Sequence, residues 1–318
     1  MVHALATVVR KMSAIPPAPS RLCPVCSVPE PIEAGERVWP LDWRCRNCGH
    51  HLPVQNGIPM LAPELANTIS GFDPASFELL ASVEATYFWF VARNELIVAL
   101  ANRFFPGAKD LLEIGCGNGA VLRSLAGSKK WLRLVGSDLH PTGLLNARNR
   151  VPEAEFIQMD ATRVSAQNAF DLIGAFDVLE HVSDDEGALR SLRRAIAPRG
   201  GIIIAVPQHP WLWSREDEIG HHVRRYRRGE LEEKLNRNGF VVMFSSSFVS
   251  VLLPLMIASR VVSRVRGAHA EREVTIAPVA NRVLLSMLRA EVRSTLAGMR
   301  WPVGGSRVVV AYAGPDRL

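Results

Sequence analysis

Three glycines at alternate positions and a series of acidic residues are the groups in this chain whose types and spacing could do chemistry. The segment LLEIGCGNGA, residues 111–120, places Glu113 at the end of an apolar run and follows it with Gly115, Gly117 and Gly119. Glycine lets the backbone approach a ligand closely in conformations that other residues avoid, so such a turn exposes N–H groups. We therefore expect this turn to bind a nucleotide-like cofactor.

Further acidic residues follow the next apolar runs along the chain. Asp138 in VGSDL ends a second apolar run, Asp160 follows EFIQM, and Asp177 follows FDLIGAF. Because the carboxyl ends of parallel strands meet at one edge of a sheet, these side chains are expected to form one site. A carboxylate at Asp138 can accept hydrogen bonds from both hydroxyls of a ribose. The glycine turn alone also fits the dinucleotide fingerprint, with Ala120 in the last place, so a dehydrogenase is an alternative.

This ordered set of motifs resembles the class I S-adenosylmethionine (SAM)-dependent methyltransferases over roughly residues 85–318. The resemblance is closest to the subgroup that includes the ubiquinone-pathway methyltransferases, in which a segment like DVLEHV also follows the fourth strand. It implies that Glu113 and the turn hold the methionine part of SAM, that Asp138 binds the ribose, and that Asp160 binds the adenine amino group. The other implied cofactor residues are the turn itself, two residues beside the adenine and two at the methyl-transfer channel: Gly115, Cys116, Gly117, Asn118, Gly119, Leu139, Ala161, Phe176 and Asp177.

The elements that must position these residues predict an α/β fold. We expect a Rossmann-like, seven-stranded, doubly wound sheet with an antiparallel terminal hairpin over about residues 70–318. A helical period over residues 86–105 predicts a helix before the first strand, and the apolar run 200–208 predicts a strand covered on both faces. Residues 239–248 and 300–314 would form the hairpin, with a helical insertion around 250–298 between them. Within it, residues 251–266 are predicted to cap the acceptor pocket, with contact to a membrane surface as the alternative.

Methyl transfer from a sulfonium is an in-line displacement, so the protein mainly aligns two reactants and excludes water. An oxygen acceptor must also lose a proton, for which His181, His209, His221 and His222 are candidates by residue type. The segment HHVRRY resembles the His and Tyr positions after strand five in the subgroup, which indicates His222 and Tyr226 as acceptor residues. The predicted catalytic set is therefore His181, His222 and Tyr226, while a capping or packing role is the alternative for His181.

Four of the five cysteines form two CxxC pairs with the spacing of a zinc ribbon. Cys23 and Cys26 make one pair, and Cys45 and Cys48 make the other. Two disulfides are the alternative, but disulfides need an oxidising compartment. A secretory signal carries its positive charges before its apolar stretch, whereas Arg10 and Lys11 come after the first apolar stretch of this chain, so we expect no such signal. We expect a disordered tail at 1–19, a zinc ribbon at 20–62 with a structural Zn²⁺, and a cytoplasmic protein.

The predicted function is methylation of a small-molecule, lipid-linked or glycan acceptor, with O-methylation favoured. A ribbon ahead of a SAM domain, followed by HLPVQNGIPML, also resembles bacterial ribosomal RNA guanine methyltransferases, so an RNA substrate is an alternative. The formal charge of +6 permits an anionic partner without requiring nucleic acid. A third hypothesis is a non-catalytic zinc-ribbon adaptor. No transmembrane segment is expected, because serines and Pro254 interrupt the uncharged run from Gly239 to Ser259, whereas peripheral membrane contact is compatible with the sequence.

Overall fold

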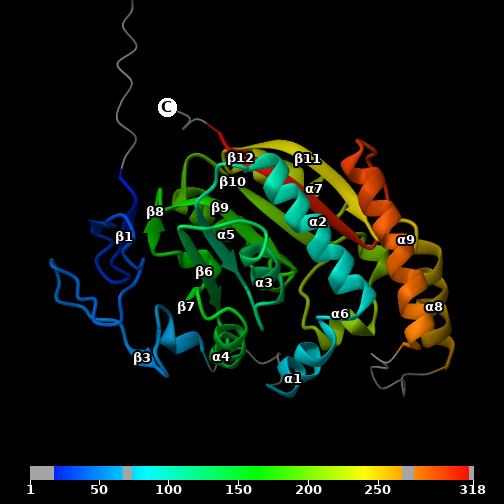
Figure 1. The fold of residues 1–318 in the computed structure, drawn as a ribbon, viewed down its shortest axis with the longest axis horizontal. Helices are drawn as coiled ribbons and strands as arrows, with labels where there is room; N and C mark the ends of the chain where they lie inside the picture. Colours follow the sequence, from blue (N-terminus) through cyan, green and yellow to red (C-terminus); the bar gives the residue numbers. More distant parts are fainter. Residues whose placement is uncertain (1–17, 67–73, 267–275, 315–318) are drawn as a thin grey trace, which may run out of the picture.

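A seven-stranded sheet forms the centre of the protein in a computed structural model that describes residues 18–66, 74–266 and 276–314 (Figure 1). The strand order is β11-β12-β10-β9-β5-β6-β7, and β12 runs antiparallel to both of its neighbours. The other pairs in the sheet are parallel. The strands are β5 (Asp110–Ile114), β6 (Arg133–Asp138), β7 (Glu155–Gln158), β9 (Phe170–Phe176), β10 (Ile196–Pro207), β11 (Phe240–Phe248) and β12 (Ser306–Ala313).

Both faces of the sheet are buried, and both are apolar. Because successive side chains of a strand point to opposite faces, neighbouring residues belong to different cores. Leu111 and Leu172 contribute to one hydrophobic core, whereas Leu112 and Ile173 contribute to the other. The first core is covered by helices α2 (Phe88–Phe104), α3 (Ala120–Ala126), α4 (Pro141–Arg150) and α9 (Pro278–Leu296), and the second by α5 (Asp185–Ala195) and α7 (Glu230–Arg237). This architecture confirms the predicted doubly wound α/β sheet with an antiparallel terminal strand pair.

The N-terminal segment from residue 18 to 66 packs against the β7 side of the sheet (Figure 1). Its strands β1 (Ser20–Leu22) and β2 (Pro29–Pro31) form a small sheet with β8 (Ala166–Gln167), while β3 (Val54–Gln55) pairs with β4 (Ile58–Pro59). The Gln158 side chain accepts from the Ala62 amide at 3.0 Å and donates to the Ala62 carbonyl at 2.7 Å. These bonds fix the segment beside the carboxyl end of β7.

Helices α8 (Leu253–Arg266) and α9 lie between β11 and β12 in the chain. Helix α9 packs on α2, buries Leu288 completely, and carries Arg289, which contacts Glu95 of α2 at 2.5 Å. Arg260 of α8 donates to the Leu212 carbonyl, so α8 touches the segment that follows β10. In the described part of the chain, none of the helices combines the length and apolar character needed to cross a membrane. The tail predicted at 1–19 falls mainly on residues 1–17, which lie outside the described residues.

Candidate functional site

The predicted cofactor residues lie along one edge of the parallel strands. In the sheet register Glu113 pairs with Gly136 and with Gly174, and Asp138 pairs with Gln158. The strand order reverses beside β5, because β6 lies on one side of it and β9 on the other. Crevices at such a switch point, outside the carboxyl ends of the strands, are where open α/β sheets bind ligands. The carboxyl ends of β5, β6, β7 and β9 therefore define the candidate site.

The turn after β5 uses backbone conformations that favour glycine. Gly115, Gly117 and Gly119 have φ values of 66°, 50° and 74°, all in the left-handed region. A Cβ atom on Gly115 would also lie 2.3 Å from Cγ2 of Val178, which follows β9. Asn118 donates to the Phe77 carbonyl at 2.8 Å, so helix α1 (Pro74–Val83) lies over the turn. Both conformation and space thus require glycine at the start of the turn.

Glu113 is a buried carboxylate facing the turn, with 2% of its surface exposed. Its Oε2 atom has no hydrogen-bond partner among the described residues. Burial raises the pKa of Glu113 well above its usual value, the charge of Arg93 acts in the opposite direction, and Asp138 adds to the rise. A buried carboxylate oxygen without a partner is costly, so this group is suited to a donor or a positive charge on a ligand.

Asp138 ends β6 with its carboxylate held by two backbone N–H groups. Gly117 donates to Oδ2 at 2.9 Å and His140 donates to Oδ1 at 2.8 Å. Burial raises the pKa of Asp138, while these hydrogen bonds work against that rise. An ionised carboxylate has about four lone-pair sites, so each oxygen can still accept one further hydrogen bond. The side chain is therefore fixed in place and can receive two hydroxyl donors.

Asp160 lies beside β7, where the N-terminal segment meets the sheet. Its two oxygens accept from the amide and the hydroxyl of Thr162, at 2.8 and 2.6 Å, so it caps the short helix η2 (Ala161–Arg163). It also lines a groove of about 260 Å³ together with Met60, Pro63 and other residues of the N-terminal segment. Ala161 is buried and Leu139 is half-buried beside this end of the site. The N-terminal segment thus walls the side of the site where adenine is expected.

Asp177, directly after β9, is paired with Arg93 of α2, a residue that the sequence did not indicate as part of the site. Arg93 is 7% exposed, and its guanidinium lies 4.6 Å from the centre of the Trp89 ring. Asp177 itself has φ 56°, which turns the chain sharply after the strand. The aromatic segment before strand β5 therefore positions the charge that holds Asp177. Phe176 instead packs back over Gly174 in the core.

Two of the three predicted catalytic residues come together after β9 and β10. The rings of His181 and His222 are 4.8 Å apart and nearly perpendicular, with Glu180 beside them. Desolvation by the surrounding groups, followed by the charge of the adjacent His222, lowers the pKa of His181 to about 4, although the residue keeps access to solvent. His222 hydrogen-bonds Asp217 through Nδ1 at 2.8 Å. The sequence placed these imidazoles in one region but gave no sign that Asp217 orients one of them.

Tyr226 is fully buried and lies in the hydrophobic core. Its hydroxyl donates to Asp185 at 2.8 Å and contacts the Leu179 carbonyl at 3.3 Å. Burial and the bond to Asp185 raise the pKa of Tyr226 well above its usual value. The structure gives this residue a packing role that ties the loop after β10 to α5, so we do not include it among the groups that contact an acceptor.

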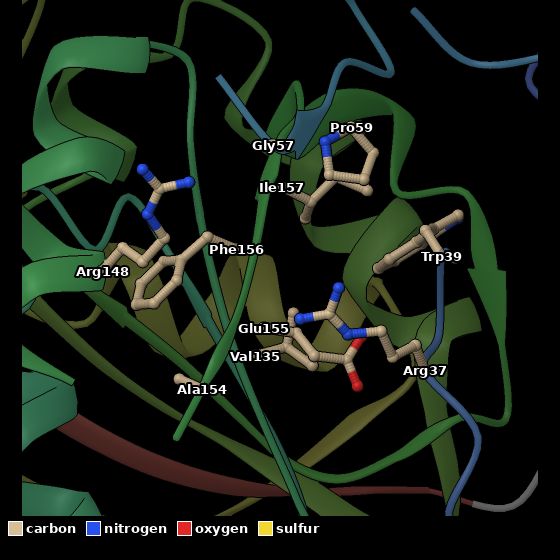
Figure 2. Close-up of a pocket in the computed structure, with 10 residues that line it drawn as sticks. All are labelled: Arg37, Trp39, Gly57, Pro59, Val135, Arg148, Ala154, Glu155, Phe156 and Ile157. Carbon is tan, nitrogen blue, oxygen red and sulfur yellow. The ribbon is translucent and has the colours of Figure 1, made fainter. Parts of the chain in front are cut away.

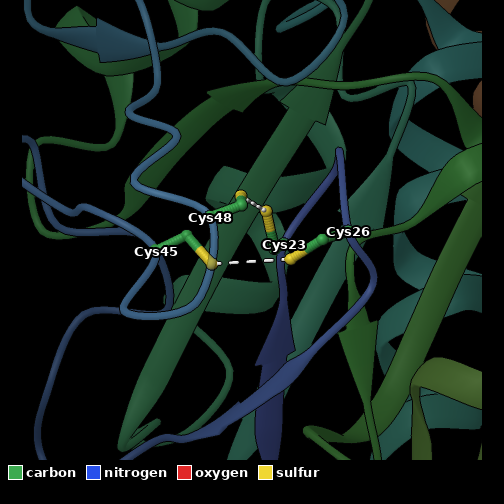
Figure 3. Close-up of side chains that lie close together, drawn as sticks. All are labelled: Cys23, Cys26, Cys45 and Cys48. Atoms are coloured by element: carbon green, nitrogen blue, oxygen red, sulfur yellow. Dashed lines mark hydrogen bonds between the residues drawn. The ribbon is translucent and has the colours of Figure 1, made fainter.

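The four cysteines of the N-terminal segment converge on one point (Figure 3). Cys23 Sγ is 3.6 Å from Cys48 Sγ, and Cys26 Sγ is 3.6 Å from Cys45 Sγ. A disulfide requires about 2.05 Å. Four sulfurs at about 2.3 Å from a tetrahedral zinc would be about 3.8 Å apart, so the donor set fits that ion. A single metal can therefore be held by all four thiolates.

A small cavity of about 30 Å³ lies between the N-terminal segment and β7, away from the site (Figure 2). Trp39 lines it, as do Glu155 and Arg148, and Trp39 Nε1 has no hydrogen-bond partner among the described residues. A cavity needs roughly 10–15 Å³ in this measure to hold one water molecule, so there is room for water here. The cavity is thus suited to a bridging water and is too small for a substrate.

Comparison with known proteins agrees with the geometry of this edge. Residues 89–243 match the family described as Methyltransferase domain. The match covers just under half of this chain, which is thus similar to methyltransferase domains. Trans-aconitate 2-methyltransferase of Acidovorax sp. (strain JS42) is 31% identical over 110 residues, which are 35% of this chain and 43% of that protein. Ubiquinone biosynthesis O-methyltransferase of Aliivibrio fischeri (strain MJ11) is 29% identical over 119 residues, 36% of this chain and 49% of that one.

A solved structure shares the fold of this chain over most of its length. It is the complex between the Haloferax volcanii Trm112 methyltransferase activator and the putative methyltransferase, with a TM-score of 0.52 and 17% identity. The match covers 77% of this chain and 96% of that one. The similarity to the curated relatives, in contrast, spans less than half of their length. The structural similarity therefore shows the fold alone, and the reaction is left to be inferred from the site.

Proposed function

We propose that this chain is a SAM-dependent methyltransferase whose acceptor is a small molecule, a lipid-linked compound or a glycan, with oxygen as the modified atom. The observation that carries the proposal is the convergence of Glu113 and Asp138 on a turn of three left-handed glycines at the switch point of the sheet. This arrangement offers backbone N–H groups and buried carboxylates to a single ligand.

The residues at this edge fit SAM chemically. The cofactor has a positive sulfonium, an ammonium group and two ribose hydroxyls, and when bound it supplies an electrophilic methyl group. Glu113 presents a buried oxygen without a partner, and Asp138 has one acceptor position left on each oxygen. Helix α1 and the N-terminal segment cover the two ends of the crevice and can limit access of water. Asp160, with Leu139 and Ala161, would bound the adenine.

The acceptor would bind on the opposite side of the cofactor, near the segments that follow β9 and β10. His181 and His222 provide two imidazoles there, and Trp211 is 56% exposed beside His209, with their rings 5.3 Å apart. Large exposed aromatic side chains can stack on an organic acceptor. The names of the two relatives, one a trans-aconitate and the other a ubiquinone-pathway enzyme, support an acceptor other than nucleic acid.

We further propose that residues 20–62 are a zinc ribbon and that the methyltransferase domain begins near residue 70, with a helical insertion around 250–298. Its ion would be structural, because four thiolates leave no open position for a substrate. The metal would then set the shape of the segment that walls the adenine side, through β1 on β8 and Ala62 on Gln158.

The proposal is tested by incubating the purified, zinc-loaded chain with methyl-labelled SAM and a cell extract separated into RNA, lipid and small-metabolite pools. We expect label in the lipid or small-metabolite pool, and none with Asp138→Ala. Label in the RNA pool would overturn the acceptor class. Binding of SAM without transfer to any pool would favour a non-catalytic adaptor instead.

A further inference from the structure

Helices α8 and α9 carry a series of exposed apolar side chains that the cofactor site does not use. On α9, Val279 and Val283 are 64% and 54% exposed, and Met287 is exposed as well. A spacing of four residues places these three along one face of the helix. Leu255 and Val261 are exposed on α8. Single exposed apolar residues are ordinary, but a repeated series on two successive helices indicates a surface that binds a partner.

The opposite face of α9 holds both helices on the rest of the protein. Leu288 and Val292 are buried in the core that α2 covers. Glu291, which is 1% exposed, accepts from the backbone amides of Ser250 and Val251 at 3.0 and 2.9 Å. These two residues come just before α8, so α9 fixes the start of that helix. The exposed series therefore lies on anchored helices.

The charges of these two helices are positive, apart from the buried Glu291. Arginine is the only charged residue type in α8, and α9 contains no other acidic residue. Arg282 and Arg293 are exposed and lie about three turns apart, so both lie beside the apolar series of α9. An apolar helix face flanked by arginines complements a bilayer that contains anionic lipids, because such a bilayer is negative at its surface and apolar beneath it.

Two other partners fit this face less well. A second copy of the chain would bring arginine against arginine, and like charges facing each other across an interface are destabilising. A membrane span is excluded for α8 and α9 over their described residues, because neither is long and apolar enough. A helix that lies in the plane of the membrane surface needs only one apolar face, which α9 has.

Helix α8 also contacts the acceptor side of the candidate site. Arg260 donates to the carbonyl of Leu212, which ends the short helix η4 (Pro210–Leu212). Trp211, the exposed aromatic residue proposed to stack on an acceptor, belongs to the same short helix. At the start of α9, Asn281 accepts from the Phe88 amide at 2.9 Å. The two helices are thus connected to the segments that border the acceptor.

We propose that the exposed apolar face of α8 and α9 docks the protein on an anionic membrane surface, from which a lipid-linked acceptor reaches the site. The arginines contact lipid phosphates, and the apolar side chains enter the boundary between headgroups and acyl chains. Both helices lie outside residues 89–243, the part that matches the Methyltransferase domain family. The choice of a lipid-linked acceptor rests on the proposed function, whereas the docking does not require the reaction.

The test is flotation of the zinc-loaded full chain with phosphatidylcholine vesicles that contain about one-third phosphatidylglycerol. The protein should float with these vesicles, remain behind with pure phosphatidylcholine, and bind less as salt screens its charges. Val279→Asp combined with Val283→Asp should bind at least about tenfold more weakly, because it places charge where the helix enters the lipid. The matched control combines Leu41→Asp with Leu132→Asp, two exposed apolar residues outside α8 and α9, and should bind as the wild type does.

A second pair of variants separates the position of the charges from their number. Arg282→Gln combined with Arg293→Gln should weaken vesicle binding about 30-fold, since each arginine near an anionic surface contributes about 1 kcal/mol. Arg190→Gln combined with Arg237→Gln removes the same charge from α5 and α7, which cover the other face of the sheet. This control should bind within about twofold of the wild type. Equal losses in the two double variants would overturn the docking surface.

The docking surface would also be overturned by a wild type that does not float with anionic vesicles, including one that instead dimerises in light scattering or binds an acidic protein. Undiminished flotation of the Val279→Asp and Val283→Asp variant would overturn it too. Titration of the same samples with S-adenosylhomocysteine separates this inference from the proposed function. Nucleoside binding without flotation would remove the docking surface alone, and flotation without nucleoside binding would count against the methyltransferase proposal alone. Circular dichroism identifies a variant that has failed to fold, and Leu255→Asp combined with Val261→Asp then provides the independent test on α8.

Discussion

Replacement of Gly115 by alanine examines the physical reason for the glycine turn. The residue has φ 66°, and its new Cβ would lie 2.3 Å from Cγ2, 3.2 Å from Cγ1 and 3.3 Å from Cβ of Val178. Rotation of Val178 gives little relief, because both methyl groups and the branch point are close and β-branched side chains are stiff at χ1. The turn must therefore shift.

The expected cost follows from two independent effects. A left-handed conformation costs a non-glycine residue about 1–2 kcal/mol, and overpacking costs about 1–3 kcal/mol. Gly115→Ala should thus lower the free energy of unfolding by about 2–5 kcal/mol. Because the turn must move, its affinity for S-adenosylhomocysteine should fall at least about tenfold, which corresponds to about 1.4 kcal/mol.

Urea unfolding and calorimetry on four zinc-loaded variants provide the assay. Val178→Ala alone should lower the free energy of unfolding by about 1–2 kcal/mol. In the double variant, which combines it with Gly115→Ala, it removes the overpacking, so the losses of the two single variants should not add. Gly107→Ala is the control, since a Cβ there meets nothing within 4 Å, and it should change stability by less than about 0.5 kcal/mol. If Gly115→Ala is as stable as Gly107→Ala, the reasoning about the turn is wrong.

Three further predictions concern the ribbon, the Arg93 pair and the acid stability of the core. Cys45→Ser should lose the zinc and lower the urea midpoint, because one thiolate is missing from the four; a variant that keeps one zinc per chain would speak against the site. Arg93→Ala should lower the free energy of unfolding by about 3–5 kcal/mol, because it leaves Asp177 without its partner near buried Glu180. An unchanged unfolding midpoint would show that the fold does not need the pair. Burial alone would raise the pKa of Asp185, but hydrogen bonds from Lys234 and Tyr226 bring it below the usual 3.8. A lowered folded-state pKa stabilises the fold above the unfolded value and loses this contribution as the pH falls through the folded value. Asp185→Asn should therefore be less stable than the wild type by a constant amount between about pH 7 and pH 5, and the difference should shrink below about pH 4; a difference that grows on acidification would refute the assignment.

The fold was predictable because local patterns and global packing agree. Runs such as 111–114 and 202–206 are apolar apart from Glu113, as strands buried on two faces require, and a glycine turn ends the first of them. The same strand ends placed Glu113, Asp138, Asp160 and Asp177 at one edge. The spacing of the two CxxC pairs likewise predicted that four sulfurs would meet, while the zinc itself stays a prediction.

The contacts that the sequence left unpredicted join residues far apart in the chain. Arg93 pairs with Asp177 across 84 positions, and His222 faces Glu180 only because the segment after β10 is hydrogen-bonded to the segment after β9. Residue type alone could not show whether Tyr226 packs in the core, as it does, or is exposed in its loop. Such pairings depend on side-chain directions in the folded molecule, which no periodicity specifies.

Calorimetric titration with S-adenosylhomocysteine tests the central claim most directly. The zinc-loaded wild type should bind one equivalent, and Asp138→Ala should bind at least about 100-fold more weakly, a loss of about 2.7 kcal/mol. Asp171→Asn is the matched control, because its carboxylate accepts from two backbone amides, those of Lys109 and Asp110, at the opposite edge of the sheet. It should bind as the wild type does. Absence of binding to the wild type, or equal affinity in Asp138→Ala and the wild type, would contradict the account.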